Sequence, residues 1–211
     1  METKALFFLL IFSGALFQCN EVQSVYKNNI NSLSTSAYQP DKFKIEDAFS
    51  FCKQNRFDTL LCILIDMKIH SGKSRFFVWD FRNETVLKKF LVSHGCCNNP
   101  WSEDKSKESP VFSNIDGSHC SSLGKYKIGA RGPSDWGIGI KYLLHGLEKS
   151  NSNAAARFIV LHSWDLIPDE EVYPAGVAEG WGCPSISNSA LMWLDSVLVK
   201  KSKPVLLWMY N

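Results

Sequence analysis

The 211-residue sequence predicts a mainly β (α+β) domain with two helices. Three observations support this fold class. Several short apolar runs, among them Phe158–Leu161, have the length and composition of buried strands. Turn residues such as Ser71-Gly72 and Arg82-Asn83 separate consecutive runs. Apolar residues at helical spacing are confined to two stretches, one near residue 45 and one after residue 187.

Two helices are expected to flank most of the strands. The first runs from a cap at Asp41 to about Arg56, and the second follows a cap at Ser187 or Asn188. The apolar face of the second helix consists of Leu191, Leu194, Val197 and Leu198. Strands are expected at Leu60–Asp66, Arg75–Trp79, Thr85–Ser93, Lys125–Ile128, Lys141–Leu144, Phe158–Leu161 and Val205–Tyr210. Residues 94–118 and 129–139 are predicted to be loops and turns.

Composition narrows the classes of partner. The formal net charge is +2, and Lys and Arg are scattered along the chain. Nucleic-acid-binding domains concentrate basic residues on one face, so no nucleic-acid partner is predicted. The 45% share of hydrophobic residues is enough for a sizeable core. Composition makes no prediction about the oligomeric state.

Residues 1–19 have the pattern of an export signal. Lys4 precedes the apolar stretch Ala5–Phe12, which is too short for a membrane-spanning helix, and small residues follow. Leu16–Cys19 resembles a bacterial lipoprotein processing site, although Gln18 stands where a small residue is expected. Two outcomes stay open, a cleaved secretory signal and membrane attachment through a lipidated Cys19. Both predict export from the bacterial cytoplasm to the periplasm or cell envelope.

A tether and a folded domain are expected after the signal. Residues 20–40 are rich in Asn and Ser and contain few large apolar side chains, which predicts a flexible tether. The folded domain is expected to span residues 41–211.

Five cysteines remain once Cys19 and Cys183 are set aside: Cys52, Cys62, Cys96, Cys97 and Cys120. An odd number leaves at least one thiol if all disulfide pairing is internal. Three alternatives stay open for His94–Cys97 and His119-Cys120: a disulfide from Cys96 or Cys97 to Cys120, unpaired thiols, or a zinc site. The long separation fits no zinc-knuckle spacing, so neither a metal nor another cofactor is predicted.

The strongest chemical signal is the pair His162 and Cys183. His162 follows a predicted buried strand, and Cys183 lies between Gly182 and Pro184 in a predicted tight turn. An imidazole can remove the proton of a thiol, and only the thiolate is a good nucleophile. A buried structural Cys and a hydrogen-bonded His remain the alternative explanation.

The pair belongs to a longer set of ordered motifs. Val160–Ser163 followed by Gly180–Pro184 resembles the signature of L,D-transpeptidases of the YkuD type, cysteine enzymes of bacterial cell-wall peptidoglycan. Within that family the chain is most similar to the branch of small murein L,D-transpeptidase catalytic-domain proteins. Further motifs of that branch appear here as His94-Gly95, Phe112-Ser113-Asn114, Ser121–Tyr126 and Gly146-Leu147-Glu148.

The resemblance implies roles for matching residues. Cys183 is the expected nucleophile, His162 its base, and the carbonyl group of Ser163 the partner that orients the imidazole. The backbone N–H groups of Gly182 and Cys183 are expected to form an oxyanion hole.

The resemblance also implies contacts with substrate. The residues expected to make them are Ser122, Tyr126, Trp164, Gly180 and Trp181. Tyr126 is expected in a strand that flanks the active site, whereas packing and groove formation both stay open for the two tryptophans. Gly180 replaces the usual Ser or Thr, and Trp181 takes a position that His often holds. Acceptor recognition is expected to depend on these two departures.

The implied fold is the mainly β sandwich of the L,D-transpeptidase family. The implied reaction is acyl transfer between peptidoglycan stem peptides through a Cys183 thioester, without a cofactor. Two alternatives stay open. Water resolving the same thioester would make the protein an L,D-carboxypeptidase or endopeptidase, and a domain without catalysis would be a wall-binding module.

Overall fold

The computed structural model describes residues 39–98 and 110–211, which belong to one compact unit of the chain, residues 38–211. The expected export signal lies outside the described residues, as does nearly all of the expected tether. Residues 99–109 of the long predicted loop also lie outside them. None of the described helices is long and apolar enough to cross a membrane.

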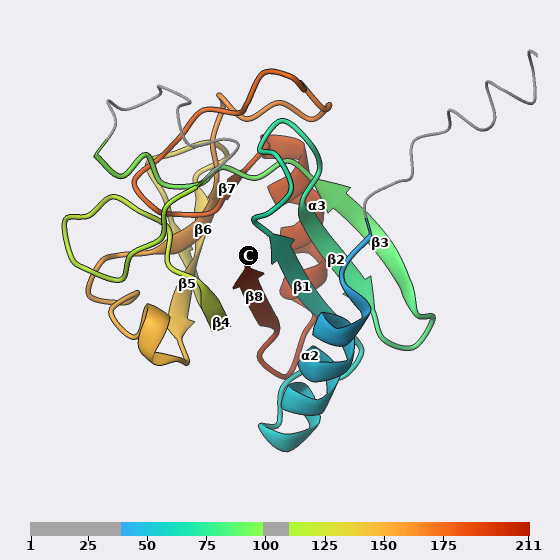
Figure 1. Ribbon diagram of the computed structural model, residues 1–211. Coiled ribbons are helices and arrows are strands. Elements are labelled where there is room, and N and C mark those ends of the chain that lie inside the picture. The colour runs from blue at the N-terminus through green and yellow to red at the C-terminus, as the bar shows by residue number, and fades with distance from the viewer. Residues whose placement is uncertain (1–38, 99–109) are drawn as a thin grey trace, which may run out of the picture. The chain divides into compact units, whose positions relative to one another are not determined.

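The described elements are mainly strands (Figure 1). In chain order they are α2 Lys42–Gln54, β1 Leu61–Asp66, β2 Phe76–Asp80, β3 Thr85–Phe90, β4 Gly124–Pro133, β5 Ile140–Gly146, the 3-10 helix η1 Lys149–Asn151, β6 Val160–Ser163, β7 Ser185–Ile186, α3 Asn188–Leu198 and β8 Leu206–Tyr210. The predicted fold class is confirmed, with one helix before the strands and one after Cys183.

All eight strands belong to one hydrogen-bonded sheet in the order β3-β2-β1-β8-β4-β5-β6-β7. The last strand of the chain, β8, lies in the middle and pairs parallel with β1 and antiparallel with β4. It therefore joins the β1–β3 half to the β4–β7 half. At the far edge β6 pairs parallel with β7, which places His162 directly beside Ser185.

Strand β1 is buried on both faces, which explains its uninterrupted apolar sequence. Its Ile63 side chain joins a core with the apolar face of α3, whereas Leu64 joins a second core with Ala48 and Cys52 of α2. The two helices therefore cover opposite faces of the sheet at β1 (Figure 1). Strands β4, β5 and β6 contribute to the same core as α3, so the sheet curls around that helix.

Both predicted helix starts are confirmed by capping hydrogen bonds. The Asp41 carboxylate accepts from the backbone N–H groups of Phe43 and Lys44, and the Ser187 hydroxyl accepts from that of Ala190. Of the two caps considered for the second helix, the structure therefore selects Ser187.

Some predicted strands have different bounds in the structure, and one strand was not predicted. Strand β4 continues to Pro133 because its partner β5 keeps pairing beyond a bulge after Ile128. Strand β6 begins at Val160 because Phe158 has a φ of 53°, which interrupts the extended backbone. Strand β7 was not predicted, because a two-residue strand carries no recognisable pattern.

Candidate active site

A pocket of about 230 Å³ lies at the end of β6. It is lined by Trp136, His162, Trp164, Gly180, Trp181, Cys183 and Ser185. The structure therefore brings the expected base and nucleophile to one pocket, together with three of the five residues expected to contact substrate. Ser163 follows His162 directly and is the last residue of β6.

The hydrogen bonds of His162 determine its tautomer. The Nδ1 atom lies 2.9 Å from the carbonyl oxygen of Ser163, which can only accept, so Nδ1 carries the proton. The Nε2 atom is therefore unprotonated, and the Ser185 hydroxyl, 2.9 Å away, donates to it. Burial lowers the pKa of His162, while the bond to Ser163 partly opposes that shift. The imidazole is therefore neutral at neutral pH, as a general base must be.

The thiol of Cys183 has other partners in this conformation. Its Sγ atom accepts from the N–H of Val160 at 3.4 Å and donates to the carbonyl oxygen of Phe158 at 3.7 Å. Burial raises the pKa of this thiol, so it is protonated. Among the described residues no hydrogen bond joins the thiol to His162. The pair is therefore in a neutral resting state.

Ser185 is a residue of the site that sequence reasoning missed. Its hydroxyl donates to the lone pair of His162 Nε2, and its side chain is 2% exposed. The available signal was its position two residues after Cys183, because alternate residues of an extended segment face the same side.

Gly182 meets two constraints that only glycine satisfies. Its φ is 98°, and a Cβ atom there would lie 2.5 Å from the carbonyl oxygen of Cys120. The N–H groups of Gly182 and Cys183 donate to no other residue of the described ranges. They are thus available to an oxyanion.

Gly180 is different, because a Cβ atom there would have nothing within 4 Å. Its departure from the Ser or Thr of the family pattern therefore has no steric cause in the described residues. It leaves open space in the pocket wall.

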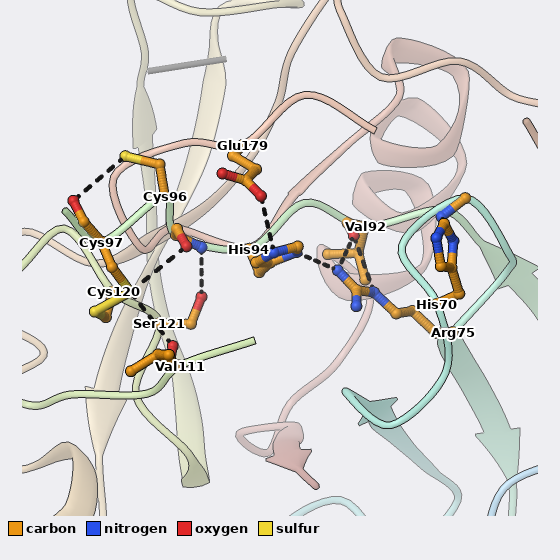
Figure 2. Close-up of polar contacts among 12 residues, drawn as sticks. His70, Arg75, Val92, His94, Cys96, Cys97, Val111, Cys120, Ser121 and Glu179 are labelled. Carbon is orange, nitrogen blue, oxygen red and sulfur yellow. Dashed lines mark hydrogen bonds and ion pairs between the residues drawn. A yellow bond between two sulfur atoms is a disulfide. The ribbon is translucent and has the colours of Figure 1, made fainter. Parts of the chain in front are cut away.

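A disulfide joins Cys97 to Cys120 (Figure 2). The backbone of Cys120 lies next to Gly182. Cys96 is a buried free thiol. The carbonyl oxygen of Cys120 accepts from Arg157 Nη2 at 2.6 Å, which fixes the segment that faces Gly182. Of the three alternatives for this cluster, the structure contains the disulfide, and no group of three metal-ligating side chains occurs among the described residues.

Ser122 and Tyr126 do not line the pocket, contrary to expectation. Tyr126 is 0% exposed and its hydroxyl donates to the Ser122 carbonyl oxygen at 2.6 Å, while Ser122 is 1% exposed. Burial raises the pKa of Tyr126 to about 12. The side chain of Tyr126 belongs to the core around α3, so this tyrosine packs inside the fold and does not line the pocket.

The tryptophans of the pocket differ in exposure. Trp164 is 6% exposed and packs in a small core with Ile167 and Val177, so it both packs and lines the pocket. Trp181 is 57% exposed, with its ring stacked on His119 at 4.8 Å. Trp136, missed by sequence reasoning because it lies in a glycine-rich turn, has its ring 6.5 Å from that of His162.

Comparisons with known proteins identify the family of the chain. Residues 30–209 match the family model described as the L,D-transpeptidase catalytic domain. A comparison with curated proteins gives no match.

Solved structures show a distant similarity. The helical cell shape determining protein Pgp2 from Campylobacter jejuni is 13% identical, with a TM-score of 0.44 over 72% of this chain and 48% of that chain. The L,D-transpeptidase (residues 123-326) from Xylanimonas cellulosilytica is 15% identical, with a TM-score of 0.39 over 71% of this chain and 60% of that chain. The chain thus spans about half the length of the Pgp2 structure.

Proposed function

The chain belongs to the L,D-transpeptidase catalytic-domain family, and from this membership we propose that it transfers acyl groups between peptidoglycan stem peptides through a Cys183 thioester. The observation that carries the proposal is the pocket that Cys183 shares with the unprotonated Nε2 atom of His162. A thiol, a neutral imidazole and free backbone N–H groups are the components that thiol acyl transfer requires.

In the first half of the reaction, the thiol turns from the Phe158 carbonyl and gives its proton to Nε2 of His162. The thiolate then attacks a carbonyl carbon of the donor stem, and the N–H groups of Gly182 and Cys183 bind the oxyanion. The tetrahedral intermediate collapses with cleavage of the C–N bond. D-alanine leaves with the proton from Nε2, and the donor acyl group remains on Cys183 as a thioester.

In the second half, an amine of the acceptor stem attacks the thioester carbonyl and transfers a proton to Nε2. The C–S bond breaks, a new amide forms, and the thiolate recovers the proton from His162. The acceptor must approach through the pocket, so the open space at Gly180 and the exposed ring of Trp181 are the proposed acceptor-facing wall.

Incubation with disaccharide-tetrapeptide muropeptides, followed by mass spectrometry, separates the candidate activities. Cross-linked dimers are the expected product. Loss of D-alanine without dimer formation would identify a hydrolase, and unchanged muropeptides would indicate a wall-binding module. The Cys183→Ala variant must abolish any product, because it lacks the nucleophile.

A carbapenem tests the nucleophile directly, because its strained carbonyl acylates reactive thiols. We expect one adduct by intact-mass measurement, absent from Cys183→Ala. Cys96→Ser is the matched control, since Cys96 is a buried thiol that does not line the pocket. An adduct of equal yield on Cys183→Ala would contradict the assignment. His162→Ala should lower the acylation rate by about 100-fold or more, the usual contribution of a general base.

We also propose that the protein acts at the cell envelope, where its family's substrate lies. Attachment through a lipidated Cys19 and release after signal cleavage are separated by fractionating cells that express the wild type or Cys19→Ser. Movement of the variant from the membrane to the soluble envelope fraction is the outcome expected of a lipid anchor.

A further inference from the structure

Three ionisable side chains form a buried row next to the Gly180–Cys183 turn. Arg75, His94 and Glu179 are 0%, 1% and 0% exposed. Figure 2 shows them in sequence, with His94 between the guanidinium and the carboxylate. Charges buried this completely are costly unless they are paired, and the proposed chemistry uses none of the three.

The tautomer of His94 follows from its partners. Arg75 Nη2 lies 2.8 Å from Nδ1, and a guanidinium can only donate, so Nδ1 is the acceptor. The ring proton is therefore on Nε2, which faces Glu179 Oε1 at 3.4 Å. A neutral His94 thus connects a buried cation to a buried anion. Burial lowers the pKa of His94, and the interaction with Glu179 partly opposes that shift.

The backbone of the same segment holds the first end of the turn. The N–H of Gly180 donates to the His94 carbonyl at 2.9 Å, and the Gly180 carbonyl accepts from Cys96 at 2.8 Å. Gly95 and Gly180 form an isolated parallel bridge. Glu179 directly precedes Gly180. The side chain of Glu179 and the backbone of Gly180 therefore both bind the segment that contains His94.

Ser93 holds the other end of the turn. Its hydroxyl donates to the Cys183 carbonyl at 3.3 Å and accepts from the Ser185 N–H at 3.0 Å. Its own N–H donates to the Ser185 carbonyl at 2.9 Å. Arg75 anchors this segment to the start of β2, since its Nε and Nη2 atoms both donate to the Val92 carbonyl.

We propose that Arg75, His94 and Glu179 form a positioning unit that fixes the Gly180–Cys183 turn, and with it the two N–H groups of the oxyanion hole. The role rests on the proposed function, because it assigns these residues to the geometry of acyl transfer. His94 acts in its neutral form only, because protonation removes the lone pair that accepts from Arg75. The charged or titratable groups that act on it include Arg75, Glu179 and His70.

Two substitutions at one position separate hydrogen bonding from volume. In His94→Gln the amide oxygen accepts from Arg75 and the amide N–H donates to Glu179, without a titratable group. His94→Leu has a similar volume but can neither accept from Arg75 nor donate to Glu179. Asp58→Leu is the control for a buried polar loss elsewhere. Asp58 pairs with Lys201 and binds the N–H of Leu61, at the opposite end of β1 from Arg75.

Two reagents read different properties of Cys183. Carbapenem acylation forms an oxyanion, whereas iodoacetamide alkylation does not. In His94→Leu we expect acylation to fall by about 100-fold, as when an oxyanion donor is lost, and alkylation by less than about tenfold. Rates are compared at a temperature where each variant is folded. His94→Gln should acylate within about threefold of wild type, and Asp58→Leu should leave both rates unchanged within the same margin.

If His94→Leu lowered the acylation rate and the alkylation rate by a similar factor, the whole site would be disturbed and the proposal would be overturned. So would equal acylation rates for His94→Gln and His94→Leu. The pH profile adds a second readout. At acid pH the wild-type acylation rate should fall as two groups, His162 and His94, each bind a proton. In His94→Gln the rate should fall through protonation of His162 alone. Identical limbs would contradict a requirement for neutral His94.

Amide hydrogen exchange tests the positioning unit without any reaction. We expect the N–H groups of Gly180 and Cys96 to exchange at least about tenfold faster in His94→Leu than in wild type, with His94→Gln and Asp58→Leu unchanged. Unaltered protection in His94→Leu would overturn the proposal even for a protein that acylates normally. Conversely, if wild type forms no carbapenem adduct, the proposed function fails while this measurement still decides the positioning role.

Discussion

The imidazole of His162 is held by hydrogen bonds at both ring nitrogens, from Nδ1 to Ser163 and from Ser185 to Nε2. A serine hydroxyl can donate to the neutral ring and, after rotation, accept from the imidazolium. Ser185 therefore suits both protonation states that a general base passes through. It is a positioning residue for the proposed reaction.

Ser185→Ala should slow acylation of Cys183 by about fivefold, because one hydrogen bond of about 1 kcal/mol no longer fixes the ring. Ser185→Thr keeps a hydroxyl and should recover most of the rate. The measurement is the rate of carbapenem adduct formation at several pH values. Faster acylation in Ser185→Ala would show that the hydroxyl restrains the base and does not assist it.

Gly180 and Gly182 form a matched pair two residues apart. Gly182→Ala places a Cβ atom 2.5 Å from the Cys120 carbonyl in a left-handed conformation, so we expect a destabilisation of about 2 kcal/mol or more and loss of acylation. Gly180→Ala meets no neighbouring atom and should keep its melting temperature within about 2 °C of wild type. Thermal unfolding compares the two, and equal melting temperatures would contradict the steric argument.

At the scale of elements, one carboxylate of α3 binds two strands of the sheet in addition to the apolar packing of the helix. Asp195 on α3 binds Arg131 Nε of β4 at 2.7 Å and the Tyr142 hydroxyl of β5 at 2.5 Å. The hydrogen bond from Arg131 holds the pKa of Asp195 below its usual 3.8, and burial opposes this shift. A lowered carboxylate pKa adds stability above the ordinary pKa, which is lost as the pH falls through the lowered value.

Asp195→Asn should therefore be less stable than wild type by about 1–2 kcal/mol at pH 7, with the two proteins converging in stability as the pH falls through the lowered pKa of Asp195. Urea unfolding across this pH range measures the difference. A difference that stays constant down to pH 2 would mean that the carboxylate charge is not involved.

The disulfide between Cys97 and Cys120 connects the polar loop to the segment before β4. Its loss in Cys97→Ser should cost about 3 kcal/mol, the value expected for a loop of this length. Acylation should also slow, since Cys120 packs against Gly182. Cys96→Ser keeps the disulfide and is the control. Equal stability of Cys97→Ser and wild type would contradict the prediction.

At the scale of the molecule, the sheet separates two hydrophobic cores and contributes side chains to both. Ile63→Ala removes a side chain from the α3 side and Leu64→Ala one from the α2 side, and each should destabilise by about 2–5 kcal/mol. Both should unfold in a single transition with unchanged cooperativity, because β1 belongs to both cores. Calorimetry that resolves two transitions in either variant would contradict this coupling.

Much of this architecture was predictable from local patterns. The capped helices and the apolar strands each carry a periodic signal, so the fold class and most element positions follow from the sequence. The pair His162 and Cys183 was identified by residue type and turn chemistry, and its lining of one pocket is a tertiary fact.

The remaining features depend on contacts between distant segments. Ser185 and Trp136 reach the pocket through strand pairing and a loop, for which no local pattern exists. Tyr126 was placed in the groove because a motif gives order along the chain but not the direction of a side chain. The choice of Cys97 over Cys96 as the partner of Cys120 likewise depends on backbone geometry.

The disulfide between Cys97 and Cys120 has a consequence for when the proposed activity could begin. The segment that faces Gly182 is joined to the polar loop by a disulfide, and disulfides form in oxidising compartments. In reducing surroundings the newly made chain would carry free thiols at Cys97 and Cys120, and the segment that faces Gly182 would lose its covalent link to the loop. Full activity would then wait for arrival at an oxidising compartment, which would spare the peptides of the cytosol from acyl transfer.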